Sequence, residues 1–222
     1  MKNNRIEGRI TSGLAPGTTV AKTLQFVKSQ LPRWRDMPDR PQVSGEEELN
    51  GQFCKYLNAA ARRENFSMAY FHHEERQTGQ RRVDMSALPP DPTVIEGRSY
   101  GILDPFLVLE GKRLPAPTHD REREYVTGGE KKSGGIQRFK LGLHGALLRH
   151  AGIIGYVQRQ SCDDWFASIN VWIAELAKGS SEWSHDECLG ELTKDEANHV
   201  ASCVSRHGRV DVKTGQICLS HL

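Results

Sequence analysis

The sequence predicts an α/β protein in which a central mixed sheet is flanked by helices. Several segments place apolar residues at helical spacing, and short apolar runs of strand length separate them. Across residues 44–178 these segments follow the order helix, three strands, helix, strand, helix. The length of 222 residues suits one sizeable domain. We expect an N-terminal arm with a short helix (1–43), a core (44–178) and a small C-terminal appendage with a hairpin (179–222).

The composition excludes several classes of protein. Charged residues make up 26% and hydrophobic residues 37%, which is ordinary for a water-soluble chain. No apolar run approaches the roughly 20 residues that span a bilayer, and no apolar segment of the signal-peptide type follows the N-terminus. Five cysteines without regular spacing favour reduced thiols. We therefore expect a cytoplasmic protein that does not engage a membrane.

Caps and prolines predict the first helices. The N-terminal arm is rich in Gly, Ser, Thr and Pro, and a short helix over 23–31 should stop at Pro32. The next helix is expected over 44–63, because Ser44 and Glu47 have the spacing of a capping box. Its buried face carries the apolar residues Leu49, Phe53, Tyr56, Leu57 and Ala60.

Three strands are expected next, over residues 66–71, 82–88 and 102–110. A turn over 74–80 joins the first two, and Gly79 can adopt positive φ there. Three prolines after residue 88 break the second strand into a loop.

The second half of the chain begins with a polar loop over residues 114–130, a length typical of lids and binding loops. A helix over 136–150, a buried strand over 153–157 and a helix over 163–178 follow from their apolar spacing. The turn of the C-terminal hairpin is expected at residues 213–215.

Two of the predicted strands carry charged residues in an arrangement that suits a metal ion. The apolar run that starts at Phe106 ends in Glu110 and Lys112, which point to the same face because side chains alternate along a strand. Asp84 lies in the strand before it. Carboxylate oxygens suit Mg²⁺ or Mn²⁺, and Lys112 would orient a water and offset charge on a phosphate. In the rival interpretation, Asp84 forms a surface ion pair.

Asp84 followed by Glu110-x-Lys112 resembles the core of the PD-(D/E)xK nuclease superfamily. The order of elements over 44–178 resembles its restriction-endonuclease-like αβββαβ fold. The resemblance implies a metal-dependent nuclease that hydrolyses DNA to a 5′-phosphate product, with a role in restriction, phage defence or repair. It implies that Asp84 and Glu110 bind the metal. Val83 replaces the family's usual proline, which leaves the carboxylate in place.

The first turn of the helix over 44–63 offers a third acid. Three glutamates stand in a row, and helical phase decides which of them faces the sheet. Glu46 lies nearest the face defined by Leu49 and Phe53, whereas Glu47 and Glu48 point away. We expect Glu46 to be a catalytic residue and a third metal ligand; a solvated acidic first turn is the rival interpretation.

The helix over 136–150 offers polar residues on a face distinct from its apolar stripe. The resemblance implies that Gln137 touches the active site or the substrate backbone, although Leu141 stands where the family often has a tyrosine. Lys140 and His144 share this face and are expected to contact substrate. A purely structural role for His144 is the alternative.

A local excess of positive charge borders the predicted site. Between residues 112 and 140, eight Lys and Arg oppose four acids. Such a stretch favours a phosphodiester partner, although a solvated charged loop shows the same pattern. We expect phosphate contacts from four residues of this stretch, namely Arg121, Arg123, Lys131 and Lys132.

Other functions stay open at this point. The chain could be a nucleic-acid-binding or scaffolding subunit that does not cut, or a nuclease of RNA or tRNA on the same fold. A homodimer or a partner protein is compatible with each of these. Zinc is a weaker alternative, because the C-terminal cysteines and histidines fit no familiar spacing: Cys188, Cys203, His207, Cys218 and His221.

Overall fold

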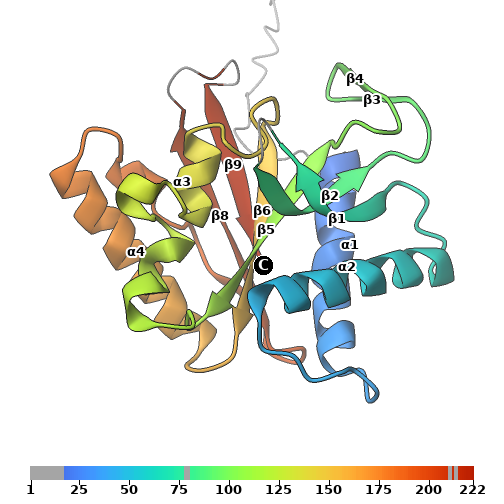
Figure 1. The fold of residues 1–222 in the computed structure, drawn as a ribbon, viewed down its shortest axis with the longest axis horizontal. Coiled ribbons are helices and arrows are strands. Elements are labelled where there is room, and N and C mark those ends of the chain that lie inside the picture. Colours follow the sequence, from blue (N-terminus) through green and yellow to red (C-terminus); the bar gives the residue numbers. More distant parts are fainter. Residues whose placement is uncertain (1–17, 78–80, 210–211, 213–214) are drawn as a thin grey trace, which may run out of the picture.

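The computed structural model describes residues 18–77, 81–209, 212 and 215–222. A seven-stranded mixed sheet forms the centre of the molecule, and helices lie on both of its faces (Figure 1). This arrangement confirms the predicted α/β class with a central mixed sheet flanked by helices. Residues 1–17 of the predicted N-terminal arm, the glycine at position 79 and the residues at 213–214 lie outside the described residues.

The helices are α1 (Thr19–Arg35), α2 (Glu46–Arg63), α3 (Gly135–Lys140) and α4 (Cys162–Gly179), with 3₁₀ turns η1 (His119–Tyr125), η2 (Gly129–Lys131) and η3 (His185–Glu187). The strands of the central sheet are β1 (Tyr70–Arg76), β2 (Arg82–Leu88), β5 (Leu107–Leu114), β6 (His150–Val157), β7 (Thr193–Asp195), β8 (Val200–Gly208) and β9 (Gln216–His221). A separate small hairpin is formed by β3 (Thr93–Ile95) and β4 (Arg98–Tyr100).

The central sheet has the strand order β1-β2-β5-β6-β9-β8-β7. Strands β5, β6 and β9 run parallel to one another, and every other neighbouring pair is antiparallel. The C-terminal hairpin β8–β9 therefore completes the sheet, because β9 pairs along β6 from His150↔Cys218 onward. The prediction that residues 179–222 form a separate appendage is wrong for this reason.

Helices α1 and α2 differ from their predicted limits. Pro32 does not stop α1, which continues to Arg35, and the Asp36 amide still bonds to the Pro32 carbonyl at 2.9 Å. Proline lacks only its own N–H, so its carbonyl can serve the next turn. The N-cap of α2 is Gly45, without a side-chain cap, so the capping box predicted at Ser44 is wrong.

Strand β1 begins later than predicted and runs through the segment expected to be a turn. It pairs with β2 from Tyr70↔Leu88 to Arg76↔Arg82, but the register skips the position of Glu74 opposite Asp84. Glu74 has φ 56°, a left-handed conformation that interrupts the ladder. The interruption lies directly beside the predicted metal ligand.

Strand β5 also begins later than predicted and extends four residues past Glu110, so that Lys112 lies within it. By contrast, α3 is short and ends at Lys140 instead of residue 150. The cause is the pair Gly142 and Gly145, which have φ 62° and 56°, values that a helix cannot accommodate. The irregular chain that follows α3 returns towards the sheet.

The two faces of the sheet have different chemistry. Leu24 of α1 and Asn50 of α2 lie against glycines on one face. On the other face Gly135, at the start of α3, lies against the side chain of Lys112. The charged residues of β2 and β5 thus project towards α3. In the described part of the chain, no helix has the length and apolar character needed to cross a membrane.

Gly111 is the point where α2 approaches the sheet most closely. A Cβ at this position would lie 1.9 Å from Oδ1 of Asn50, which is buried and accepts a 2.8 Å hydrogen bond from the Tyr156 hydroxyl. We expect Gly111→Ala to lower the free energy of unfolding by about 2 kcal/mol, because overpacking and the displaced hydrogen bond add. Urea denaturation measures this.

Gly179→Ala is the matched control, since a Cβ there meets nothing within 4 Å. It should leave the denaturation midpoint unchanged or slightly higher. Equal midpoints for the two variants would mean that Asn50 can move aside at no cost.

Candidate active site

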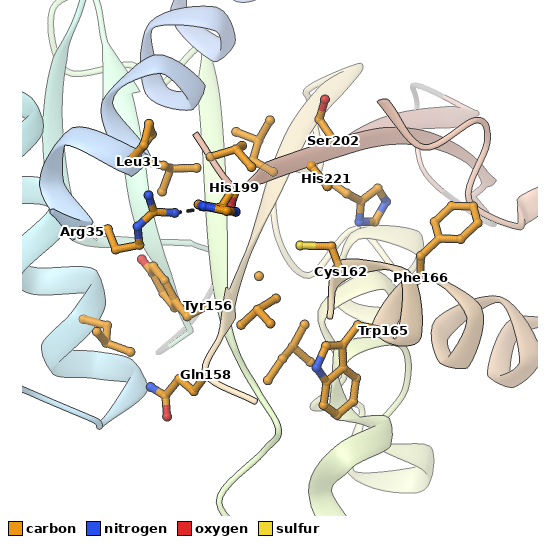
Figure 2. Close-up of a pocket in the computed structure, with 18 of the residues that line it drawn as sticks. Leu31, Arg35, Tyr156, Gln158, Cys162, Trp165, Phe166, His199, Ser202 and His221 are labelled. Atoms are coloured by element: carbon orange, nitrogen blue, oxygen red, sulfur yellow. Dashed lines mark hydrogen bonds between the residues drawn. The ribbon is translucent and has the colours of Figure 1, made fainter. Parts of the chain in front are cut away.

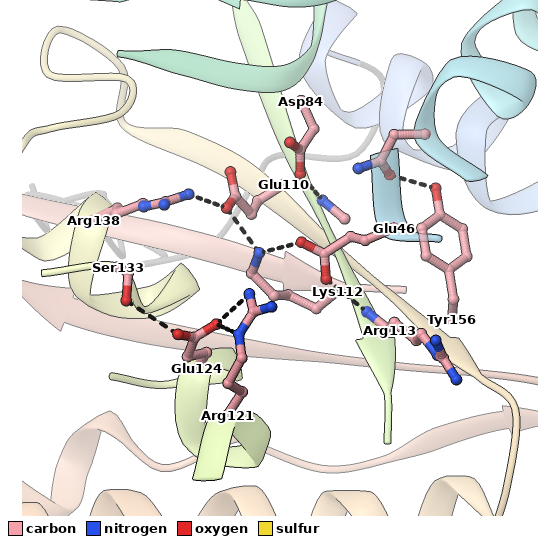
Figure 3. Close-up of polar contacts among 12 residues, drawn as sticks. Glu46, Asp84, Glu110, Lys112, Arg113, Arg121, Glu124, Ser133, Arg138 and Tyr156 are labelled. Atoms are coloured by element: carbon pink, nitrogen blue, oxygen red, sulfur yellow. Dashed lines mark hydrogen bonds and ion pairs between the residues drawn. The ribbon is translucent and has the colours of Figure 1, made fainter. Parts of the chain in front are cut away.

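Strands β2 and β5 bring the three predicted strand residues to one face of the sheet. Met85 pairs with Leu109 in the ladder, so their neighbours Asp84 and Glu110 project to the opposite face together. Oδ2 of Asp84 accepts a 2.7 Å hydrogen bond from the Gly111 amide (Figure 3). The alternation of strand side chains therefore places these groups as the sequence predicts.

Lys112 lies at the centre of the cluster. Its Nζ donates to Oε1 of Glu46 at 2.8 Å and lies 3.1 Å from Oε1 of Glu110, with only 10% of its side chain exposed. The other oxygen of Glu46 accepts from the Arg113 amide at 3.0 Å. Helical phase thus identified the glutamate that reaches the sheet, and Lys112 connects α2 to β5.

Glu110 is completely buried, and cations surround it. Its Oε1 accepts a 2.7 Å hydrogen bond from Nη1 of Arg138, which is 29% exposed (Figure 3). Its Oε2 lies 3.1 Å from Nδ1 of His144, yet neither of these buried atoms has a hydrogen-bond partner. His144 was predicted to contact substrate; it instead lies buried against the carboxylate.

Arg138 was not predicted from the sequence. It follows Gln137 in the short helix α3 and belongs to the basic stretch before residue 140. The basic stretch is the sequence signal that could have pointed to Arg138, but it contains many cations and does not single out this one. What selects Arg138 is the position of α3 over β5, which depends on contacts between segments distant in sequence.

Burial and charge push the two carboxyl groups in opposite directions. Burial, reinforced by the charge of Glu110, raises the pKa of Asp84 to about 7. Burial also acts to raise the pKa of Glu110, but the charges of Lys112, His144 and Arg138 outweigh it and lower that pKa below its usual range. The carboxyl group of Asp84 therefore titrates near pH 7, whereas that of Glu110 stays ionised.

Lys112 stays charged despite its burial. Burial acts to lower its pKa, but the carboxylates of Glu110, Glu46 and Asp84 outweigh this effect and raise the pKa above the ordinary value. A fixed cation between three acids can hold a water molecule and face a phosphate at once.

The donor set suits a hard divalent cation in part. Asp84 and Glu110 are adjacent oxygen donors, and the buried Oε2 of Glu110 lacks a hydrogen-bond partner. Glu46 faces Lys112 instead, and among the described residues no group of three or more His, Cys, Asp or Glu gathers closely enough for a metal. The predicted three-carboxylate set is not assembled. Mg²⁺ usually needs only one or two carboxylates plus substrate phosphate, which fits the pair.

Two further predicted residues serve the structure itself. The side-chain amide of Gln137 bridges the Gly128 amide and the Gly129 carbonyl, both at 3.0 Å, and so fastens the preceding loop. Lys140 is buried, pairs with Glu187 and lies over the ring of Trp183. The prediction that Lys140 contacts substrate is wrong, because its charge is already used inside the protein.

The loop cations differ in their freedom to meet a phosphate. Arg121 pairs with Glu124 at 2.8 Å, and Arg123 pairs with Glu175 of α4 at 2.6 Å. Lys131 and Lys132 are exposed, at the end of η2. Arg121 nevertheless senses the charge of Glu46, which raises its pKa in addition to the larger effect of Glu124. The loop therefore borders the cluster, as predicted.

The residues weighed as a zinc site have other partners. His207 and His221 both contact Oγ of Ser205 at 2.7 Å. The cysteines at 188, 203 and 218 have free thiols.

Comparison of the chain with protein-family models, with curated proteins and with solved structures yields no match.

The cation of Lys112 should dominate the stability of the cluster. Lys112→Met leaves Glu46 and Asp84 without their shared cation, and breaking a buried ion pair costs about 3 kcal/mol. We expect the free energy of unfolding, measured by urea denaturation without metal, to fall by about this amount.

The matched control is Lys131→Met, which removes an exposed charge in the neighbouring loop and should change little. If the two variants unfold at the same urea concentration, the ion pairs of Lys112 contribute no net free energy to the stability of the fold.

Proposed function

We propose that this protein is a metal-dependent nuclease with a restriction-endonuclease-like core. The observation that carries the proposal is the placement of Asp84, Glu110 and Lys112 on one face of two paired strands, with Nζ of Lys112 3.1 Å from Glu110. With the separate β3–β4 hairpin set aside, the elements α2, β1, β2, β5, α3 and β6 follow the αβββαβ order that the resemblance implies. DNA is the substrate that the resemblance implies.

The roles follow from the contacts. Asp84 and Glu110 would hold the cation from β2 and β5. A bound Mg²⁺ would lower the pKa of a water and offset charge on the phosphate. Lys112 would hold that water and face the phosphate oxygens, and Glu46 fixes its ammonium group at 2.8 Å. Arg138 would face the same phosphate, because its side chain contacts Glu110 and is 29% exposed.

A second function has one specific observation in its favour. Glu110 already has Lys112 and Arg138 as charged partners and His144 beside it, and such a closed cluster can persist without a metal. A nucleic-acid-binding subunit that does not cut would retain this cluster for stability. The effect of Mg²⁺ on cleavage and on thermal stability separates the two functions, and parallel assays on plasmid, single-stranded DNA and RNA define the substrate.

Asp84→Asn keeps the shape of the side chain and removes its charge. We expect a loss of cleavage of roughly 100-fold or more in Mg²⁺, with nucleic-acid affinity nearly unchanged, because the metal and not the substrate loses its ligand. Mg²⁺ should raise the melting temperature of the wild type and fail to raise that of the variant.

Asp91→Asn serves as the control, since Asp91 is exposed in the loop after β2. EDTA should abolish wild-type cleavage. Cleavage by Asp84→Asn at the wild-type rate would refute the assignment of this site.

The acidic triplet allows an internal comparison. Glu46→Gln keeps a hydrogen-bond acceptor but loses the charge that fixes Lys112, so cleavage should fall by roughly tenfold or more. Glu48→Gln, two residues along α2, changes a side chain that folds back to Gly45 and should leave the rate unchanged. Single-turnover cleavage of a labelled duplex measures both, and equal small effects would remove Glu46 from the mechanism.

A further inference from the structure

A second cavity lies away from the charged cluster, at the carboxyl ends of the three parallel strands. Its volume is about 470 Å³, and the last residues of β5, β6 and β9, which are Leu114, Val157 and His221, line it (Figure 2). Small-molecule sites commonly measure about 300–1,000 Å³ and commonly lie at this end of parallel strands. Helices α1 and α4 close it on opposite sides.

Aromatic side chains form facing walls of the cavity. Tyr156 of β6 lies on one side, and Trp165 and Phe166 of α4 lie on the other (Figure 2). Trp34 of α1 also lines the cavity, and the centre of its ring lies 5.8 Å from that of Tyr156. Opposed aromatic surfaces favour a flat ring between them, because stacking adds to the burial of apolar area.

The charged side chains among the described residues that line the cavity are basic. Arg35 and Arg40 border the cavity, whereas no Asp or Glu occurs among the described residues that line it. Arg35 is already paired with Asp36. The guanidinium of Arg40 lies 4.7 Å from the centre of the Trp34 ring, and its buried Nε and Nη1 have no hydrogen-bond partner among the described residues. A carboxylate or phosphate would supply the missing acceptor.

The far end of the cavity is polar but uncharged. Both ring nitrogens of His221 have hydrogen-bond partners: the Tyr125 hydroxyl lies 2.8 Å from Nδ1, and the Ser205 hydroxyl lies 2.7 Å from Nε2. Burial lowers the pKa of His221 to about 3, so the ring is neutral. The anionic end of a ligand is therefore expected at Arg40 and not at the histidine.

We propose that this cavity binds a small molecule that consists of a planar aromatic ring joined to a phosphate or carboxylate. The ring lies between Tyr156 and Trp165, and the anionic group contacts Arg40. This binding site is inferred from the residues that line the cavity and is independent of the proposed nuclease activity. A nucleotide and an aromatic acid share this chemistry, and the experiment separates them.

Thermal shift and titration calorimetry on the full chain test the proposal with five ligands: adenosine monophosphate, adenosine, inorganic phosphate, indole-3-acetate and hexanoate. At least one of the two ring-bearing anions should bind, and about tenfold or more tighter than the compounds that lack either the ring or the charge. Binding of adenosine monophosphate alone identifies a nucleotide site, and binding of indole-3-acetate alone identifies an aromatic-acid site.

Arg40→Gln should weaken that binding by about tenfold or more, because the anion loses its charged partner. Arg33→Gln removes a cation from the same region of the chain that does not line the cavity, and it should leave binding unchanged. Ala201→Phe, which fills the cavity from β8, should abolish binding while circular dichroism shows the fold intact.

The proposal is overturned if neither ring-bearing anion binds, if hexanoate binds as tightly as indole-3-acetate, or if Arg40→Gln binds like the wild type. Binding to the nuclease cluster instead would show as sensitivity to Asp84→Asn with none to Arg40→Gln, which also overturns it.

Discussion

The buried ammonium group of Lys112 is the constraint on which the site depends. A lysine this deep in a protein stays charged only if acids surround it, and here they come from three different elements: Glu46, Asp84 and Glu110. The start of α2 must therefore lie over β5, and the helix begins at Glu46 instead of two residues earlier. Its N-cap is Gly45, which gives no side-chain hydrogen bond, so the ion pairs of Glu46 are the polar side-chain contacts that fix this end of the helix to the sheet.

The part of the site that could be predicted from the sequence is the part that local periodicity determines. Alternation along a strand places Glu110 and Lys112 together, and the phase of a helix selects Glu46 from three neighbouring glutamates. Arg138 was not found this way, and His144 was predicted as a substrate contact and not as a partner of Glu110. Arg138 reaches Glu110 because α3 lies over β5, and His144 reaches it because two glycines end α3 early and turn the chain back.

The same distinction between local periodicity and long-range contacts explains which parts of the fold could be predicted. Helices and strands of the predicted core were recognisable from apolar spacing. The partner of the C-terminal hairpin was not, since the residues of β9 pair with residues of β6 that lie 68 positions earlier, as in His150↔Cys218. Period-2 patterns show which face of a strand is buried and not which strand lies beside it. Lys140 was misassigned for a related reason: its partner Glu187 belongs to a distant segment, and from sequence alone an exposed and a buried lysine look alike.

The left-handed residue in β1 has a consequence for how copies of this protein meet. An edge strand of seven residues offers unpaired backbone groups to which a second sheet could add, which invites aggregation. Glu74 breaks the regularity of that edge with its φ of 56° and carries a charge there, while the opposite edge, β7, is three residues long and wholly exposed. Both margins of the sheet are thus poor templates for strand addition, so two copies that associate would have to meet through helices or loops.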